Sequence, residues 1–543
     1  MQGLMQVAPL TIVDIFERCE SMFPDHKVIT RGPAPHEYTY GDWAKRVRRL
    51  GTALDELGLS DDARVGTFCW NHHQHLELYY AIPCTGRVMH NLNIRLFPEQ
   101  LVYIVNHAED EAVFVDRSLL PLFLPILDQS PTVKKVIVID DGSGPEVVDG
   151  ERFLDYEQLI ADRAPAQFFV EDENTASGMC YTSGTTGNPK GVLYSHRSTW
   201  LHAMGMTSSM TIAVANTDRA LVVVPMFHAN AWGMPYAAPM CGAELVFPGS
   251  DMSPAALARI FQDDRITIGM GVPTIWQGML PLLDQYDFSA VRAITSGGSA
   301  VPRALIKEFR DRVGVPMLQG WGMTETSPVA SIAKPQRRDL GKSPDELLDV
   351  AAQAGTIVGG VQARVASLET GEAQPWDGES TGELQVRGNW IAREYFKGET
   401  PLSTEDGWMR TGDIAAITPE GVIRIVDRTK DLVKSGGEWI SSVDVENILM
   451  AHPDVREAAI VGVPHPKWTE RPLACVVLKD GVEPSEQKKQ EILEFLAPQI
   501  AKWWMPDAVE FIDEVPKTSV GKFSKKDLRD AYAGYQLPDA AGR

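Results

Sequence analysis

Short runs of β-branched and other apolar residues alternate with stretches of helical spacing along the first 300 residues. The runs that we predict as strands are 65–70, 112–116, 133–140, 221–227, 266–272 and 291–295. Strands that alternate with helices are typical of layered α/β proteins. Loops rich in glycine, such as Gly297-Gly298-Ser299 and Gly320-Trp321-Gly322, follow predicted strands. Open α/β sheets bind ligands at the carboxyl ends of their strands, so we expect functional residues there.

The pattern changes near Asp427-Arg-Thr-Lys-Asp431, after which a compact order of strand, helix, strand, strand, helix and strand begins. Helical spacing is found at 443–452 and 485–502, and strand-like runs are found at 455–463, 472–478 and 508–515. We therefore predict a large layered N-terminal α/β domain (1–427), a hinge linker (428–432) and a small mobile α+β domain (433–543).

The segment 220–243 contains no Asp, Glu, Lys or Arg and is long enough to cross a bilayer. However, Pro225, Pro235 and Pro239 would interrupt a helix, and His228 and Asn230 would need polar partners in lipid. The sequence predicts a strand followed by a buried loop that belongs to the active site.

Composition narrows the choice of partners. The chain has 543 residues, 44% of them hydrophobic, and a formal charge of −22, which disfavours binding to nucleic acid. The six cysteines form no CxxC pair, which is typical of reduced thiols in a cytoplasmic protein. The first residues lack the basic and apolar regions of a signal peptide. We expect a cytoplasmic protein without a transmembrane segment.

The string YTSGTTGNPKG at 181–191 combines hydroxyl residues, glycines and a lysine. Glycines let main-chain N–H groups approach phosphate oxygens, and a lysine adds a positive charge, so the loop predicts phosphate binding. It is not a Walker loop, because Pro189 stands at the second glycine position and Gly191 follows the lysine. A solvated turn is the alternative. The candidate phosphate-binding residues are Thr182, Ser183, Gly184, Thr185, Thr186, Gly187 and Lys190.

Further strings follow in a specific order: SGGS (296–299), QGWGMTE (319–325), GELQVRG (382–388), WMRTGD (408–413), Asp427-Arg428 and PKTSVGK (516–522). Together with the 181–191 loop they resemble the adenylate-forming superfamily of acyl-CoA synthetases, peptide-synthetase adenylation domains and beetle luciferases. The strings VPMFHANAW (224–232) and KSGGEWISS (434–442) are most similar to bacterial medium- and long-chain fatty acyl-CoA synthetases. The resemblance implies an ATP-dependent ligase that forms an acyl-adenylate and then an acyl-CoA thioester. It also implies that ATP, Mg²⁺ and coenzyme A are needed.

The same resemblance implies roles for individual residues. Thr185 and Glu325 would hold Mg²⁺, Thr324 would reach the α-phosphate, and Asp413 would bind the ribose. The remaining implied nucleotide contacts are Gly298, Ser299, Gln319, Gly320, Trp321, Gly322, Arg428 and Lys430. The family more often has tyrosine at the position of Trp321, so we expect ring stacking to be kept and a phenol hydrogen bond to be lost. Plain core packing is the alternative role for this tryptophan.

Lys522 stands where the family places the lysine that bridges carboxylate and phosphate. Without the resemblance, a solvated lysine in a basic cluster would be the simpler interpretation. The family rotates its C-terminal domain about a linker residue, here Lys430, which would withdraw Lys522 and bring 434–439 to the site. Lys434 and Trp439 would contact nucleotide, and Ser435, Gly436, Gly437 and Glu438 would border the coenzyme A path.

The identity of the acid is less constrained. The resemblance implies an acyl pocket or gate formed by His228, Ala229, Trp232, Gly233 and Val272, with His228 also near the reacting carboxylate. No aspartate follows the Pro-x-Phe string to pair with a substrate amine. We predict medium- to long-chain fatty acids, with a short sulfur-containing acid such as 3-methylmercaptopropionate, an aryl acid, or transfer to a carrier protein as alternatives. A luciferase-like oxygenase and an inactive nucleotide sensor are further alternatives.

The methionines 226, 234, 240, 270, 279 and 317 fit either an adaptable acyl pocket or ordinary core packing, and we expect core packing for most of them. Related fatty acyl enzymes pair through their N-terminal domains, so the resemblance also implies a homodimer. A long-chain substrate would bring the protein close to a membrane surface.

Overall fold

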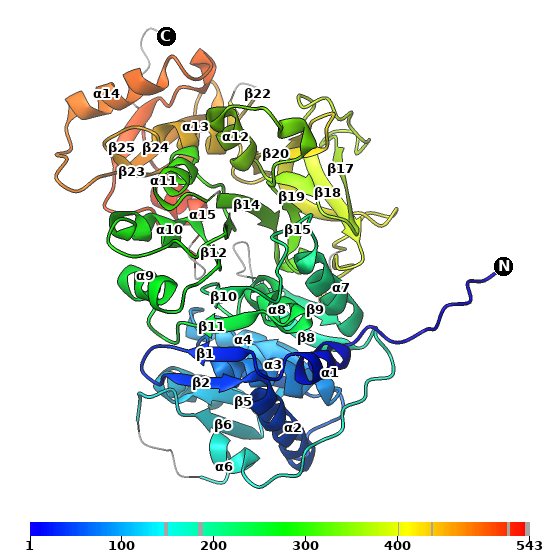
Figure 1. Ribbon diagram of the computed structural model, residues 1–543. Coiled ribbons are helices and arrows are strands. Elements are labelled where there is room, and N and C mark those ends of the chain that lie inside the picture. The colour runs from blue at the N-terminus through cyan, green and yellow to red at the C-terminus, as the bar shows by residue number, and fades with distance from the viewer. Residues whose placement is uncertain are drawn as a thin grey trace.

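The computed structural model describes residues 1–145, 150–182, 188–315, 317–399, 401–435, 438–518 and 522–537. Within these residues, strands and helices alternate and form three sheets with helical layers between and outside them (Figure 1). The predicted α/β class is therefore confirmed.

The first sheet is built from seven strands that run parallel except for the antiparallel edge strand β9. Its strands, in spatial order, are β7 (Phe153–Asp155), β6 (Lys135–Ile139), β5 (Asp110–Asp116), β3 (Arg64–Phe68), β4 (Val88–Asn91), β8 (Ala176–Tyr181) and β9 (Gly191–Ser195).

The second sheet has thirteen strands, of which one half is mainly parallel and the other half is antiparallel. The parallel half contains β1 (Lys27–Thr30), β11 (Glu244–Phe247), β10 (Arg219–Val222), β12 (Ile268–Gly271), β13 (Ala293–Gly297) and β14 (Met317–Gly322), and β2 (His36–Thr39) is antiparallel at its edge. The antiparallel half contains β15 (Val329–Ile332), β16 (Gly355–Ile357), β20 (Val422–Arg428), β19 (Met409–Ile417), β18 (Gly382–Gly388) and β17 (Val361–Ala366).

Alternating burial along the strands explains the layers. In β5, Ala112 and Phe114 pack into the core between the two sheets, whereas Val113 and Val115 pack into the outer core. The inner layer contains α1 (Ile12–Met22), α2 (Tyr40–Glu56), α3 (His73–Cys84), α6 (Tyr156–Ile160), α7 (His196–Thr207) and α8 (Met234–Cys241). The outer helices are α4 (Pro98–Ala108) and α5 (Leu120–Leu127) on the first sheet, and α9 (Pro254–Asp263), α10 (Pro273–Met279), α11 (Arg303–Val313) and α12 (Pro344–Ala351) on the second.

The third sheet uses only residues after the predicted linker. Its strands are β21 (Val433–Ser435), β22 (Glu438–Ile440), β23 (Val455–His465), β24 (Thr469–Leu478) and β25 (Ala508–Phe511), packed with α13 (Ser442–Leu449), α14 (Glu486–Leu496) and α15 (Lys525–Ala531). It forms the orange and red end of the chain in Figure 1. The short 3₁₀ helices are η1 (Arg117–Leu119), η2 (Ala229–Gly233), η3 (Leu280–Leu282), η4 (Thr324–Thr326), η5 (Arg337–Asp339) and η6 (Lys502–Trp504). Arg428, the first residue of the predicted linker, is the last residue of β20, and the division into two domains stays a prediction.

The prediction of a buried loop after β10 is wrong in part, because the helix α8 forms in this segment despite its prolines. Pro235 lies in the first turn, where a missing N–H costs nothing. Pro239 cannot donate to the carbonyl of Pro235, but that carbonyl accepts a hydrogen bond of 2.9 Å from the Tyr80 hydroxyl of α3. The tertiary contact replaces the bond that proline removes.

In the described ranges, no helix combines the length and apolar character that a bilayer crossing requires. The parallel strands β12, β13 and β14 instead end side by side, in register over Met270, Thr295 and Leu318. Their carboxyl ends border the site described below.

Candidate active site

A cavity of about 1430 Å³ lies at the carboxyl ends of β12–β14 and extends to β19, β20, α13 and the segment that leads into α15. It is lined by many of the predicted site residues: Thr182, Lys190, His228, Ala229, Trp232, Gly298, Ser299, Gln319, Gly320, Trp321, Gly322, Thr324, Glu325, Asp413, Arg428, Lys430 and Lys522. Residues that are far apart in sequence therefore meet in one space.

Trp321 and Asp413 form the best-defined part of the predicted nucleotide wall. The indole N–H of Trp321 donates a 2.8 Å hydrogen bond to Oδ2 of Asp413, and Nε of Arg428 lies 3.3 Å from Oδ1. Asp413 and Arg428 face each other across β19 and β20. Trp321 thus makes a polar contact in addition to packing in the core. We expected the hydrogen bond of a tyrosine hydroxyl to be lost at this position, but the indole N–H donates one instead.

Gly298 and Gln319 shape the neighbouring wall. Gln319 accepts a 2.8 Å hydrogen bond from the N–H of Val301 through its side-chain oxygen, which fixes the loop after β13. Gly298 has φ +85°, a left-handed conformation that favours glycine. A Cβ atom at this position would lie 2.9 Å from Cε of Lys522. Glycine is therefore needed both for the turn and for the close approach of the lysine.

Lys522 reaches this cavity from the segment just before α15. Burial lowers the pKa of its ammonium group to about 8, with a further lowering by the charge of Arg428 and opposition from Asp413 and Glu325. Lys522 is thus not a solvated surface lysine in this structure. A depressed lysine pKa indicates that the site holds too little negative charge to balance this ammonium group. An anionic ligand would supply the missing charge.

Glu325 is buried in η4 and is held by a residue that the sequence analysis missed. The hydroxyl of Tyr395 donates a 2.6 Å hydrogen bond to Oε1 of Glu325, and the N–H of Ala392 donates to the Glu325 carbonyl at 2.8 Å. Tyr395 lies 70 residues further along the chain, between two motifs, so no local spacing indicates the pairing.

The predicted phosphate loop is described only at its ends. The N–H of Thr182 donates to the carbonyl of Lys190 at 2.9 Å, and the N–H of Lys190 donates to Oγ1 of Thr182 at 3.1 Å, which closes the base of the loop. The ammonium group of Lys190 lies 4.8 Å from the centre of the Tyr395 ring. Ser183, Gly184, Thr185, Thr186 and Gly187 lie outside the described residues, so their predicted roles stay predictions.

The predicted acyl wall has an unusual backbone. Residues 229–233 have φ values between +43° and +80°, and four of the five are not glycine. Each such residue costs about 1–2 kcal/mol in a left-handed conformation. The side-chain oxygen of buried Asn230 accepts a 2.8 Å hydrogen bond from Asn91 at the end of β4, which ties this turn to the other sheet.

His228 and Trp232 border the cavity next to this turn. Burial, together with the charges of Lys522 and Arg95, lowers the pKa of His228 to about 3, so its imidazole is neutral near pH 7. The indole of Trp232 packs toward Gly297, whose added Cβ would lie 3.4 Å from the ring. Gly233 packs against the ring of His202, and Val272 lies beside Gly298 without bordering the cavity.

Apolar side chains continue the wall beyond Trp232. Met206, Ile212, Met270, Val329 and Ile332 all border the cavity. The other methionines that we considered, at 226, 234, 240, 279 and 317, are core residues, as expected. Met206 and Ile212 were missed, because neither stands in a motif.

The described residues of the β21–β22 hairpin do not border the cavity. Lys434 lies over the ring of Trp439 at 5.3 Å, and the hydroxyl of Ser435 accepts a 3.1 Å hydrogen bond from Arg471 within the C-terminal sheet. Gly436 and Gly437 lie outside the described residues, as does the side chain of Glu438. The predicted nucleotide and coenzyme A contacts of this hairpin stay predictions.

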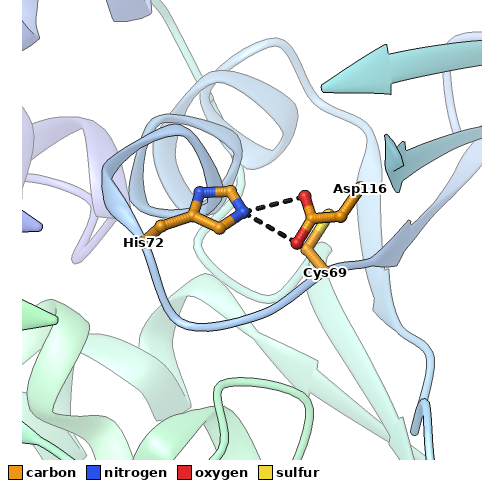
Figure 2. Close-up of side chains that lie close together, drawn as sticks. All are labelled: Cys69, His72 and Asp116. Carbon is orange, nitrogen blue, oxygen red and sulfur yellow. Dashed lines mark hydrogen bonds and ion pairs between the residues drawn. The ribbon is translucent and has the colours of Figure 1, made fainter. Parts of the chain in front are cut away.

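A separate buried cluster joins Cys69, His72 and Asp116 near the start of α3 (Figure 2). Nε2 of His72 lies 2.8 Å from Asp116, while Nδ1 accepts the N–H of His75 at 3.2 Å. The proton of the neutral imidazole is therefore on Nε2. A metal ion bound at Nε2 would require the proton to be on Nδ1 instead. There it would face the N–H of His75, which is also a donor. The cluster caps α3 and is not a metal site.

Comparison with known proteins agrees with this geometry. The model of the AMP-binding enzyme family matches residues 16–396, and the model of the AMP-binding enzyme C-terminal domain matches residues 444–522. The chain belongs to the AMP-binding enzyme family, and the resemblance to the adenylate-forming superfamily is confirmed.

Relatives match over nearly the whole length. A 3-methylmercaptopropionyl-CoA ligase of Ruegeria lacuscaerulensis is 41% identical over 98% of this chain and 99% of its own. A long-chain-fatty-acid–CoA ligase of Thermus thermophilus is 43% identical over 97% and 96%, respectively. Among solved structures, ATP-bound MatB from Rhodopseudomonas palustris has a TM-score of 0.82 and 25% identity, and the match covers 97% of this chain and 99% of that one.

Substitution of Trp321 by phenylalanine should weaken ATP binding about tenfold, because Asp413 loses a hydrogen-bond donor to its charged carboxylate while the aromatic face is kept. Calorimetric titration with ATP measures the change. The control is Trp376→Phe, whose ring is 46% exposed and lies outside the cavity. Equal affinities in the two variants would show that the indole hydrogen bond has no role in binding.

Proposed function

We propose that the protein is an ATP-dependent acid–CoA ligase that forms an acyl-adenylate and then an acyl-CoA thioester. The observation that carries the proposal is the position of Lys522, which lies just before α15 and approaches Gly298 on the predicted nucleotide wall. Family membership supports the use of ATP, and the names of the two relatives at 41% and 43% identity support coenzyme A as acceptor.

In the first step, a carboxylate anion must approach a phosphate anion. Lys522 lies where its ammonium group would contact both, and a cation about 4 Å from an anion contributes roughly 4 kcal/mol at an effective dielectric of 20. Trp321 and Asp413 would hold the adenosine, and the neutral imidazole of His228 would border the carboxylate without adding charge. The lysine would thus account for two to three decades of rate.

The residues present fit Mg²⁺. Glu325 offers a buried carboxylate at the cavity, and a hard oxygen donor suits this ion. Glu325 and Thr185 would hold it, and when bound it would neutralise phosphate charge.

The second step requires that Lys522 leave and that the thiol of coenzyme A enter. We propose rotation of the C-terminal domain about Lys430 for this purpose. Such a rotation must break contacts that cross the hinge: the N–H of Ser442 donates to Asp427 at 2.8 Å, and the hydroxyl of Ser441 donates to the carbonyl of Val426 at 2.7 Å. The glycines 436 and 437 would then border the thiol path.

The substrate that we propose is a medium- to long-chain fatty acid. The apolar wall from Trp232 to Met206 and Ile332 supports it, as does the long-chain relative. A short sulfur-containing acid is the second candidate, favoured by the relative that is named for 3-methylmercaptopropionate. We further propose a homodimer formed through the N-terminal domain, by analogy with fatty acyl enzymes.

A panel of acids from acetate to palmitate, with aryl and sulfur-containing acids, tests the function. We expect release of AMP that depends on both acid and coenzyme A, with the highest kcat/KM for medium- to long-chain fatty acids. Preference for 3-methylmercaptopropionate would support the second candidate. Absence of AMP release with every acid would contradict the ligase function.

The adenylation rate should fall above about pH 8. Only the ammonium form of Lys522 can bridge the two anions, and the lowered pKa means that this form is lost as the pH rises through about 8. The kcat/KM of acid-dependent ATP–pyrophosphate exchange should decrease about tenfold per pH unit beyond that point. Residual exchange in Lys522→Arg should show no such decrease, because arginine keeps its charge. A flat wild-type profile up to pH 10 would rule out this role for Lys522.

Substitution of Gly298 by alanine should lower ATP–pyrophosphate exchange about 100-fold, because the new methyl group displaces Lys522 from the wall. Thioester formation from supplied acyl-AMP should be much less affected. Gly314→Ala is the matched control, since Gly314 has φ +82° and no atom within 4 Å of an added Cβ. A similar loss in both variants would mean that backbone strain, and not displacement of Lys522, is responsible.

A further inference from the structure

Tyr395 stands where two parts of the site meet. It belongs to the loop between β18 and β19, which is bonded on both sides. The N–H of Ala392 donates to the carbonyl of Glu325 at 2.8 Å, and the N–H of Phe396 donates to the carbonyl of Gly191 at 2.9 Å. The loop thereby joins the η4 turn to the strand that follows the phosphate loop.

The side chain of Tyr395 uses both its polar tip and its aromatic face. Its hydroxyl donates to Oε1 of Glu325 at 2.6 Å, and its ring lies 4.8 Å from the ammonium group of Lys190. One half-buried residue thus contacts the carboxylate and the lysine at the same time.

These contacts restrict how the two charged groups can move. A carboxylate that accepts a hydrogen bond at Oε1 cannot rotate freely. Oε2 is the oxygen of Glu325 that does not accept the hydrogen bond from Tyr395. A lysine over an aromatic face keeps its charge but loses part of its rotational freedom. Fixed partners of this kind orient ligands for a cation in many metal sites.

We propose that Tyr395 is a positioning residue that sets Glu325 and Lys190 relative to each other, so that a metal-bound triphosphate meets both at once. The inference rests on the proposed function and adds a residue to it. Tyr395 acts through Glu325 and Lys190 and does not itself need to touch the reacting atoms.

Two substitutions separate the hydroxyl from the ring. Tyr395→Phe removes the hydrogen bond to Glu325 and keeps the aromatic face for Lys190, whereas Tyr395→Leu removes both. Tyr535→Phe is the matched control, because the hydroxyl of Tyr535 donates to the carboxylate of Glu510 at 2.5 Å outside the cavity.

The measurement is calorimetric binding of ATP with and without Mg²⁺, in the absence of any acid. Tyr395→Phe should reduce the Mg²⁺-dependent increase in ATP affinity about tenfold, since a charge-assisted hydrogen bond is lost. Its affinity for metal-free ATP should stay within about twofold of the wild type, because the ring still holds Lys190. Tyr395→Leu should weaken binding under both conditions, and Tyr535→Phe should change neither.

A full Mg²⁺-dependent increase in Tyr395→Phe would overturn the proposal, as would an equal loss with and without Mg²⁺, which indicates only a structural role. A second measurement uses Glu325→Gln: adding Tyr395→Phe to it should cause no further loss of the Mg²⁺ effect if the two residues act together. Because no acid is present, these results are independent of the acid panel, whose failure would concern the ligase function alone.

Discussion

Accumulation of partly buried charge in one cavity is the constraint on which the rest of the site depends. Lys522 and Arg428 repel each other there, while Asp413 and Glu325 offset only part of that repulsion. The depressed pKa of Lys522 is the consequence, because a low-dielectric site penalises a cation that has no full partner. An anionic triphosphate would offset the cost of burying this cation. The same electrostatics that disfavour the charged form of Lys522 in the free protein therefore favour binding of the nucleotide.

Two carboxylates of the site, Asp413 and Glu325, are fixed in the same way. Each accepts a hydrogen bond from an aromatic side chain of a distant segment: Asp413 from the indole of Trp321, and Glu325 from the hydroxyl of Tyr395. Aromatic side chains have few rotatable bonds, so they hold a carboxylate at little entropic cost. The site therefore combines cations with carboxylates whose orientation is set by rigid neighbours.

The acyl side depends on a different kind of support. The turn at 229–233 keeps a left-handed backbone at four non-glycine residues, and Asn91 from the first sheet bonds Asn230 in its middle. A strained segment persists only where its surroundings hold it. The position of Trp232 thus depends on how the two sheets pack.

The sequence by itself determined the α/β class and indicated many of the residues that border the cavity, because periodicity and motif order are local properties. It also indicated Lys522 through its motif. Only the tertiary structure decided that α8 continues through Pro239, that Tyr395 holds Glu325, and that Asn91 supports the acyl turn. The last two pairs are 70 and 139 residues apart, and the hydroxyl that replaces the lost helical bond comes from Tyr80, 155 residues from its partner. Such contacts arise from the packing of layers, and no pattern within one segment can encode them.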